Sequence, residues 1–135
     1  WRTAKNAKVL DKIWDMKPFD RGMAIEKMLG GWCDNFPVID KYDKITKTAT
    51  SIKSIDLNAK SYASPSAIKR KLNEYTDALY NFTGYENKKH KAQKILQKKL
   101  EIAIPSNSSE AALHAVDDAI KYANDKGIEV IIHKM

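Results

Sequence analysis

Charged side chains interrupt two strand-like stretches in the first half of the sequence. In residues 36–40, FPVID, side chains alternate between the two faces of a strand, so Val38 and Asp40 would share a face. In the next strand-like stretch, Ser51 and Lys53 share a face by the same rule. Charged groups on a face that should be apolar are typical of functional sites. An Asp at a strand end and a Lys on an exposed face also occur without any function, so both interpretations stay open on these residues alone.

Glu26 would add a second carboxylate from a neighbouring helix. Two carboxylates that converge can hold a hard divalent cation, which can neutralise a phosphate oxygen and lower the pKa of a bound water. Lys53 could orient or deprotonate that water and contact the phosphate, and the hydroxyl of Ser51 could ligate the metal or its water. Glu26, Asp40, Ser51 and Lys53 are therefore candidate residues of a metal-dependent phosphodiesterase.

Proline and glycine mark the helices that must position Glu26. Apolar residues recur at helical spacing in residues 3–16. Pro18 should end that helix, because the residue before a proline disfavours the helical conformation. Asp20 is the expected N-cap of a second helix, which carries Glu26 and stops at the Gly30-Gly31 pair.

Strands and helices alternate in the rest of the chain. Ser64, followed by a proline, is a helix-start signal, and Asn107 with Glu110 resembles a capping box. The expected strands are 36–40, 48–55, 99–104 and 128–133, and the expected helices are 64–82 and 108–126. Two neighbouring strands followed by strands that alternate with helices predict an α/β fold, with a mixed central β-sheet flanked by helices.

Length and composition favour one domain with a real core, since 43% of the 135 residues are hydrophobic. The chain begins at Trp1, so we expect a piece of a longer protein. No apolar run approaches the roughly 20 residues that span a bilayer, and no signal-peptide pattern is present. The single cysteine, Cys33, excludes an internal disulfide and a cysteine-based metal site, which suits a reducing compartment.

The net charge is +7, from 24 Lys and Arg against 17 Asp and Glu. An excess made mostly of lysine favours attraction to phosphate backbones over the reading of bases. A soluble lysine-rich surface is the alternative. Lys91, Lys94 and Lys98 would share one face of a helix and are candidate nucleic-acid-binding residues, unless that face is simply solvated.

The stretches RGMAIEKML, NFPVID and ATSIKSIDLNAKSY resemble the nuclease toxin domains of contact-dependent growth inhibition proteins. Those domains lie at the C-termini of such proteins and belong to the PD-(D/E)XK, or restriction-endonuclease-like, superfamily. The resemblance implies that fold, with Glu26 and Asp40 as metal ligands and Lys53 as the catalytic lysine. Ser51 departs from the superfamily pattern, which has Glu or Asp two residues before the lysine. Ser51 is a candidate metal ligand, and Glu26 could supply the carboxylate that is missing at this position. The metal stays open between Mg²⁺ and Zn²⁺.

The resemblance covers most of the chain, and it predicts a single nuclease toxin domain at 1–135, with 1–17 as an N-terminal helix or linker and 18–135 as the catalytic core. The S-x-K form resembles the DNase branch, which favours DNA as the substrate. A tRNA-cleaving nuclease of the same fold and a non-catalytic basic nucleic-acid-binding module are the alternatives.

The resemblance also implies a partner and a route. We expect a cognate immunity protein, acidic because this chain is basic. We further expect the domain to be the C-terminal part of a secreted or cell-surface bacterial protein that is delivered into the target-cell cytoplasm.

Overall fold

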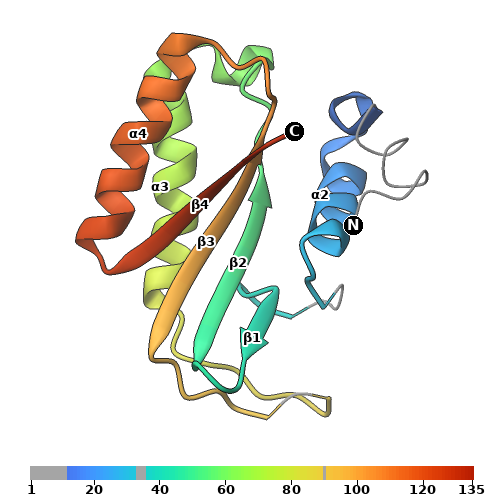
Figure 1. Cartoon of the computed structure of the whole chain (residues 1–135), viewed down its shortest axis with the longest axis vertical. Coiled ribbons are helices and arrows are strands. Elements are labelled where there is room, and N and C mark those ends of the chain that lie inside the picture. Colours follow the sequence, from blue (N-terminus) through green and yellow to red (C-terminus); the bar gives the residue numbers. More distant parts are fainter. Residues whose placement is uncertain (1–11, 33–35, 90) are drawn as a thin grey trace.

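A four-stranded sheet forms the centre of the computed structural model, which describes residues 12–32, 36–89 and 91–135. The strands lie in the order β1 (Lys41–Asp43), β2 (Thr48–Ser54), β3 (Gln97–Ile104) and β4 (Ile128–Lys134). β1 is antiparallel to β2, whereas β2, β3 and β4 are parallel. Helices α3 (Pro65–Asn81) and α4 (Glu110–Asp125) lie side by side on one face, and α2 (Pro18–Met28) lies on the other (Figure 1). The predicted mixed α/β sheet with flanking helices is confirmed.

Helices α3 and α4 are the crossovers that parallel strands require. Ser64 caps α3 as predicted, and its Oγ accepts the N–H of Ala67 at 3.2 Å. The face of the sheet beneath these helices holds the larger core, in which Leu72, Leu100 and Ile104 are at most 1% exposed. This core fixes the orientation of β2 and α3, which both carry residues of the site.

Helix α2 packs on the opposite face through a smaller cluster. Ile25 from α2 meets Ile52 of β2 and Ala103 of β3, and Ile13 from the short 3₁₀ turn η1 (Ile13–Asp15) completes the cluster. These contacts hold α2 against β2. No helix in the described residues is long and apolar enough to cross a membrane.

The first predicted strand, residues 36–40, is a loop. Pro37 has no N–H to donate to a neighbouring strand, and Val38 has a φ of 67°, which interrupts extended backbone. β1 begins at Lys41, within the stretch that we expected to connect two strands. Asp40 is therefore the last loop residue before the sheet, and the expected face shared by Val38 and Asp40 does not exist.

Two predicted helix caps are also wrong. α2 begins at Pro18, because a proline suits the first helical position, and Asp20 lies inside the first turn instead of capping it. At α4, the N-cap is Ser109, whose Oγ accepts a backbone N–H at 3.1 Å. Asn107 instead accepts a hydrogen bond from the side chain of Asn58 at 2.9 Å.

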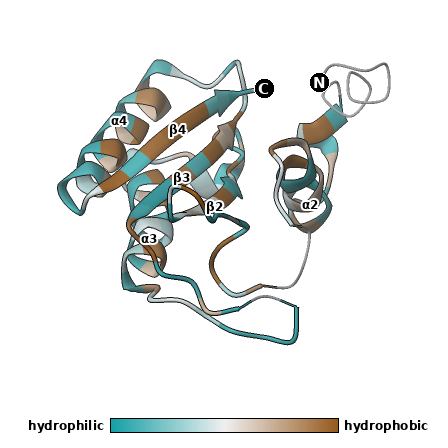
Figure 2. Ribbon diagram, turned by 60° about the horizontal axis from the view of Figure 1, so that its bottom comes forward, coloured by the Kyte–Doolittle hydropathy of each residue, from teal (hydrophilic) through white to brown (hydrophobic). Residues whose placement is uncertain are grey.

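The lysine-rich segment before β3 is a loop, so Lys91, Lys94 and Lys98 do not share a helix face. Closely spaced like charges disfavour a helix, and Lys98 is taken into β3, where it pairs with Ala49. Lys98 Nζ donates to the carbonyl of Tyr80 at 2.6 Å, whereas Lys91 and Lys94 are exposed. Figure 2 shows this loop as mostly hydrophilic.

Most of the predicted helix at 3–16 lies outside the described residues, and its described end forms η1. The division of the chain at residue 17 stays a prediction.

Candidate active site

The candidate active site lies where β1 leaves the edge of β2. β1 pairs with β2 up to Thr50 and does not cover residues 51–54 of that edge. The backbone N–H of Asp40 donates to the carbonyl of Thr50 at 2.8 Å, and Asp40 Oδ2 accepts the N–H of Ile52 at 2.6 Å. The loop before β1 therefore fixes a carboxylate on the uncovered half of the strand edge.

Glu26 reaches the same place from the end of α2. The N–H of Gly31 donates to the carbonyl of Glu26 at 2.8 Å, and a Cβ at Gly31 would lie 2.4 Å from Glu26 Cγ. The turn after α2 thus packs directly on this side chain. Glu26 lies close enough to Asp40 for the two side chains to interact.

Burial raises the pKa of Asp40, while the hydrogen bond from Ile52 and the charge of Lys53 oppose the rise. Lys53 is on β2, and its Nζ lies 5.4 Å from the centroid of the Tyr75 ring on α3. The lysine is therefore held between a carboxylate and an aromatic ring. A partly buried carboxyl group beside an ammonium group in a pocket is typical of catalytic and binding sites.

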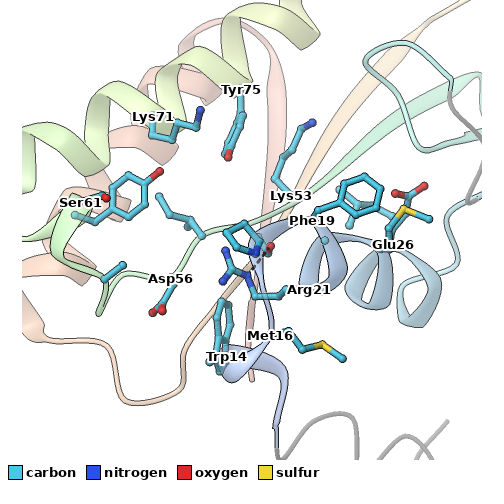
Figure 3. Close-up of a pocket in the computed structure, with 18 of the residues that line it drawn as sticks. Trp14, Met16, Phe19, Arg21, Glu26, Lys53, Asp56, Ser61, Lys71 and Tyr75 are labelled. Carbon is cyan, nitrogen blue, oxygen red and sulfur yellow. Dashed lines mark hydrogen bonds between the residues drawn. The ribbon is translucent and has the colours of Figure 1, made fainter.

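One pocket of about 760 Å³ joins these groups, between α2, β2 and α3 (Figure 3). Glu26, Asp40 and Lys53 all line it. They come from a helix, a loop and a strand, and the fold brings them together although the sequence separates them. Three of the four predicted catalytic residues thus share one site.

Ser51 is not among the residues that line this pocket. It is 1% exposed and pairs in register with Leu100, which belongs to the core under α3 and α4. Ser51 and Lys53 do alternate onto the same side of β2, but Lys53 reaches the pocket and Ser51 stays beneath the helices. Its role as a third metal ligand stays a prediction.

Two carboxyl groups suit a hard divalent cation in this pocket. In the described residues, no group of three or more His, Cys, Asp or Glu side chains could hold a metal ion. Glu26 and Asp40 nevertheless line the same pocket, and Glu26 lies close enough to lower the pKa of Asp40. One or two carboxylates with water and substrate phosphate are a common ligand set for Mg²⁺. The donor groups present therefore fit a cation that is completed by water and substrate.

Other acidic and histidine residues lie elsewhere or serve turns. Asp43 is the last residue of β1, and its Oδ1 accepts the N–H groups of Ile45 and Thr46 in the turn that follows. These hydrogen bonds lower the pKa of Asp43. His133 bonds to Glu101 at 2.9 Å on the face of the sheet that carries α2.

Several cationic and hydroxyl side chains of the pocket were not predicted from the sequence, and Arg21, Lys71 and Tyr75 are the most informative of them. Arg21 lies near the start of α2, and Lys71 and Tyr75 come from α3. Lys71 and Tyr75 are four residues apart, a spacing that places them on one helix face. This spacing, beside the apolar stripe of the helix, could have indicated that the two side chains lie together at the edge of the core. Nothing around Arg21 in the sequence indicates that it is buried.

Comparison with known proteins identifies the family. The CDI toxin restriction endonuclease-like domain, where CDI is contact-dependent growth inhibition, matches residues 21–133. The chain belongs to this family. The resemblance inferred from the sequence motifs is therefore confirmed, and so is the restriction-endonuclease-like fold.

Two comparisons show the extent of the similarity. The chain is 27% identical over 137 residues to deoxyribonuclease CdiA-o11 of Escherichia coli O157:H7 (strain EC869), and this alignment covers 94% of the chain. The chain spans 36% of the length of that protein. A structure of a CdiA-CT/CdiI toxin and immunity complex from Yersinia pseudotuberculosis matches 82% of this chain and 98% of the solved chain, with a TM-score of 0.71 and 19% identity.

Proposed function

We propose that this domain is a metal-dependent endonuclease toxin that hydrolyses phosphodiester bonds of DNA in competing bacteria. The observation that carries the proposal is the convergence of Glu26, Asp40 and Lys53 in one pocket at the uncovered edge of β2. Membership of the CDI toxin family supports the nuclease class, and a relative named as a deoxyribonuclease supports DNA over RNA.

Glu26 and Asp40 would hold a divalent cation, Mg²⁺ or Zn²⁺. When bound, the cation would supply Lewis-acid stabilisation of the negative charge that develops on the phosphate. The hydrogen bond from Ile52 keeps the Asp40 carboxylate in one orientation. Lys53 would contact the scissile phosphate through its ammonium group and orient the attacking water.

Nucleic-acid cleavage in vitro tests this function. Purified domain is incubated with supercoiled plasmid and with bulk tRNA, in Mg²⁺, in Zn²⁺ and in EDTA. We expect plasmid nicking and linearisation with one or both metals, and none in EDTA or with Asp40→Ala. Asp43→Ala is the matched control, since it removes an exposed carboxylate of the neighbouring turn.

The same gel separates the alternatives. Cleavage of tRNA with intact plasmid would replace DNA by RNA as the substrate. Retarded nucleic acid without cleavage under any metal condition, and unchanged by Asp40→Ala, would identify a non-catalytic basic binding module.

An acidic immunity protein is the proposed partner, and the target-cell cytoplasm is the proposed place of action. The basic charge of +7 supports an acidic surface on the partner, because complementary charges speed association. The fold neighbour from Yersinia pseudotuberculosis is a toxin in complex with its immunity protein, which supports this kind of partner. Bacterial growth should stop when the domain is expressed in the cytoplasm and resume when the immunity protein is co-expressed. Unaffected growth with soluble domain would contradict the toxin proposal.

A further inference from the structure

The pocket extends well beyond the carboxylates and Lys53. Figure 3 shows Arg21, Lys71 and Tyr75 projecting into its other half, from α2 and from α3. A scissile phosphate and a cation need only the end at Glu26 and Asp40. The remaining half therefore has room for a further part of the substrate.

Arg21 is the most unusual group in this half, because it is 8% exposed. Nε donates to Ser54 Oγ at 3.2 Å, and the guanidinium carbon lies 5.2 Å from the centroid of the Trp14 ring. Among the residues that the structure describes, no ion pair involves Arg21. Arginine is rarely buried unless it is paired, since an uncompensated buried charge is costly. The two terminal nitrogens are thus suited to an anion that enters the pocket.

Two groups of α3 face the same space. Lys71 Nζ lies 5.3 Å from the centroid of the Tyr75 ring, near the 5.4 Å that separates Lys53 Nζ from that centroid. Burial, with smaller contributions from Tyr62 and Glu74, raises the pKa of Tyr75 to about 12, while the charge of Arg21 acts in the opposite direction. The Tyr75 hydroxyl therefore stays protonated and can donate a hydrogen bond.

Two acidic groups lie near these donors. Glu74 Oε2 lies 3.5 Å from Lys71 Nζ at an exposed position of α3, and Asp56 lines the pocket. Asp56 Oδ1 accepts the backbone N–H of Asn58 at 3.1 Å. In Figure 3, the Asp56 carboxylate is turned away from Lys71 and Tyr75. The side chains that point into this half of the pocket are thus mainly hydrogen-bond donors.

We infer that Arg21, Lys71 and the Tyr75 hydroxyl form a second phosphate subsite, which binds the phosphate next to the scissile one. Arg21 presents a planar pair of donors that suits phosphate oxygens, and Lys71 adds a second charge. The Trp14 ring and Ser54 hold the guanidinium in place before the substrate arrives. This subsite rests on the proposed nuclease function, and it would set which phosphate meets Lys53.

The test measures how each protein variant responds when a single phosphate of the substrate is neutralised. The main cut of the wild-type domain is first mapped on a defined DNA duplex in the active metal. Duplexes are then made with one neutral methylphosphonate at each position on either side of the cut. Steady-state cleavage of each duplex is measured for wild type, Arg21→Gln and Lys71→Gln. Arg70→Gln is the matched control, because Arg70 is an exposed arginine next to Lys71 on α3.

For wild type, we expect one flanking methylphosphonate to lower kcat/KM by about 10-fold, the loss typical of a charged hydrogen bond. Arg21→Gln and Lys71→Gln should lower kcat/KM on the unmodified duplex by a similar factor, mainly through KM. On that same methylphosphonate duplex, the kcat/KM of each variant should fall by less than about twofold from its value on the unmodified duplex, because the contact with that phosphate is already absent. Arg70→Gln should behave as wild type at every phosphate.

Each other outcome has a distinct meaning. If both pocket variants remain fully sensitive to every methylphosphonate, the subsite inference is overturned while the nuclease proposal stands. If the wild-type domain cuts no unmodified duplex in Mg²⁺ or Zn²⁺, the proposed function itself fails. Should Arg21→Gln lose its folded structure, Lys71→Gln decides, since Lys71 is partly exposed and its ion pair is with the exposed Glu74 on the same helix.

Discussion

Asp40 Oδ2 accepts the backbone N–H of Ile52 at 2.6 Å, at the point where β1 no longer covers the edge of β2. One carboxylate oxygen of Asp40 thus accepts a hydrogen bond from the backbone of β2. This hydrogen bond also fixes the orientation of the other carboxylate oxygen. The same residue lies beside Glu26 in the pocket, close enough for Glu26 to lower the pKa of Asp40. The Asp40 side chain therefore has two roles, a hydrogen bond that stabilises the fold and a candidate metal ligand. A substitution must keep the first role if an experiment is to test the second.

Asp40→Asn should abolish cleavage while preserving the fold. The amide keeps an oxygen that can accept the N–H of Ile52, but it removes the negative charge that a cation needs. We expect the cleavage rate to fall by more than about 100-fold, beyond the loss seen when outer partners of a metal site are removed. Asp40→Ala should in addition lower the free energy of unfolding by about 1–3 kcal/mol, because a buried donor loses its acceptor.

Plasmid cleavage and thermal unfolding of both variants check this difference. Asp43→Asn is the control, since it makes the same chemical change three residues later in an exposed turn. Full activity in Asp40→Asn would remove Asp40 from the site.

Lys53→Met should stop cleavage without stopping cation binding. Lys53 lies beside Asp40, and its proposed contact is with the phosphate rather than the metal. Loss of a positioned acid–base group typically costs about 10²–10⁴-fold in rate. Removing its positive charge should leave cation affinity unchanged or slightly higher. Isothermal titration of Mg²⁺ and Zn²⁺ into Lys53→Met and wild type measures this, and a loss of affinity would contradict the assigned role. Lys44→Met, at an exposed turn position, is the control.

Gly31→Ala should inactivate the domain through Glu26. The new Cβ would lie 2.4 Å from Glu26 Cγ and 3.1 Å from its carbonyl oxygen, so the Glu26 side chain must move. Gly30→Ala is a close control, because Gly30 has a φ of +84° but nothing within 4 Å of the added atom. It should cost about 1 kcal/mol of stability through backbone strain and keep its activity. Equal activity in the two purified variants would show that the position of Glu26 does not matter.

Most of the long strands and helices could be predicted from the sequence, whereas the loops and helix caps were predicted less well. Strands β2, β3 and β4 and helix α3 lie where apolar spacing and the Ser64 cap placed them, because each buries a continuous apolar face. The strand expected at 36–40 failed, since alternating side chains cannot reveal the left-handed backbone of Val38.

The residues of the site could be predicted only where the local sequence marks them. Glu26, Asp40 and Lys53 could be selected as charges in unusual places. Arg21 could not, because its burial depends on how α2 packs on β2, and this long-range contact leaves no local pattern in the sequence.

The loop lysines should contribute electrostatic attraction to nucleic acid, although they do not form a helix face. Lys91 and Lys94 are exposed, whereas Lys98 is bound to the carbonyl of Tyr80, and burial lowers its pKa. Lys91→Gln with Lys94→Gln should therefore weaken binding of the Asp40→Asn domain to duplex DNA and flatten its salt dependence by roughly one unit of slope per lost phosphate contact. Fluorescence anisotropy at several salt concentrations measures the slope. An unchanged slope would show that these lysines serve solubility alone.

Glu101 should make the stability of the fold depend on pH in the acidic range. It is 6% exposed, its Oε2 lies 2.9 Å from Lys41 Nζ, and its Oε1 lies 2.9 Å from His133 Nε2. Burial alone would raise the pKa of Glu101, but Lys41 and His133 outweigh it and hold the pKa below its ordinary value of 4.5. Lys41 is fixed as well, because its Nζ donates to the carbonyl of Leu29 at 2.9 Å.

The direction of the pH effect follows from this lowered pKa. Above pH 4.5 both the folded and the unfolded chain carry an ionised Glu101, so its stabilisation is fully present. As the pH falls from there toward the lower pKa of the folded state, the unfolded chain takes up the proton first, and the free energy of unfolding decreases. Glu101→Gln should remove this part of the pH dependence and cost about 1–3 kcal/mol at neutral pH. Urea unfolding of wild type and Glu101→Gln between pH 3 and pH 7 measures both effects. Glu129→Gln, at an exposed position of β4, is the control, and equal pH profiles for wild type and Glu101→Gln would show that this network does not stabilise the fold.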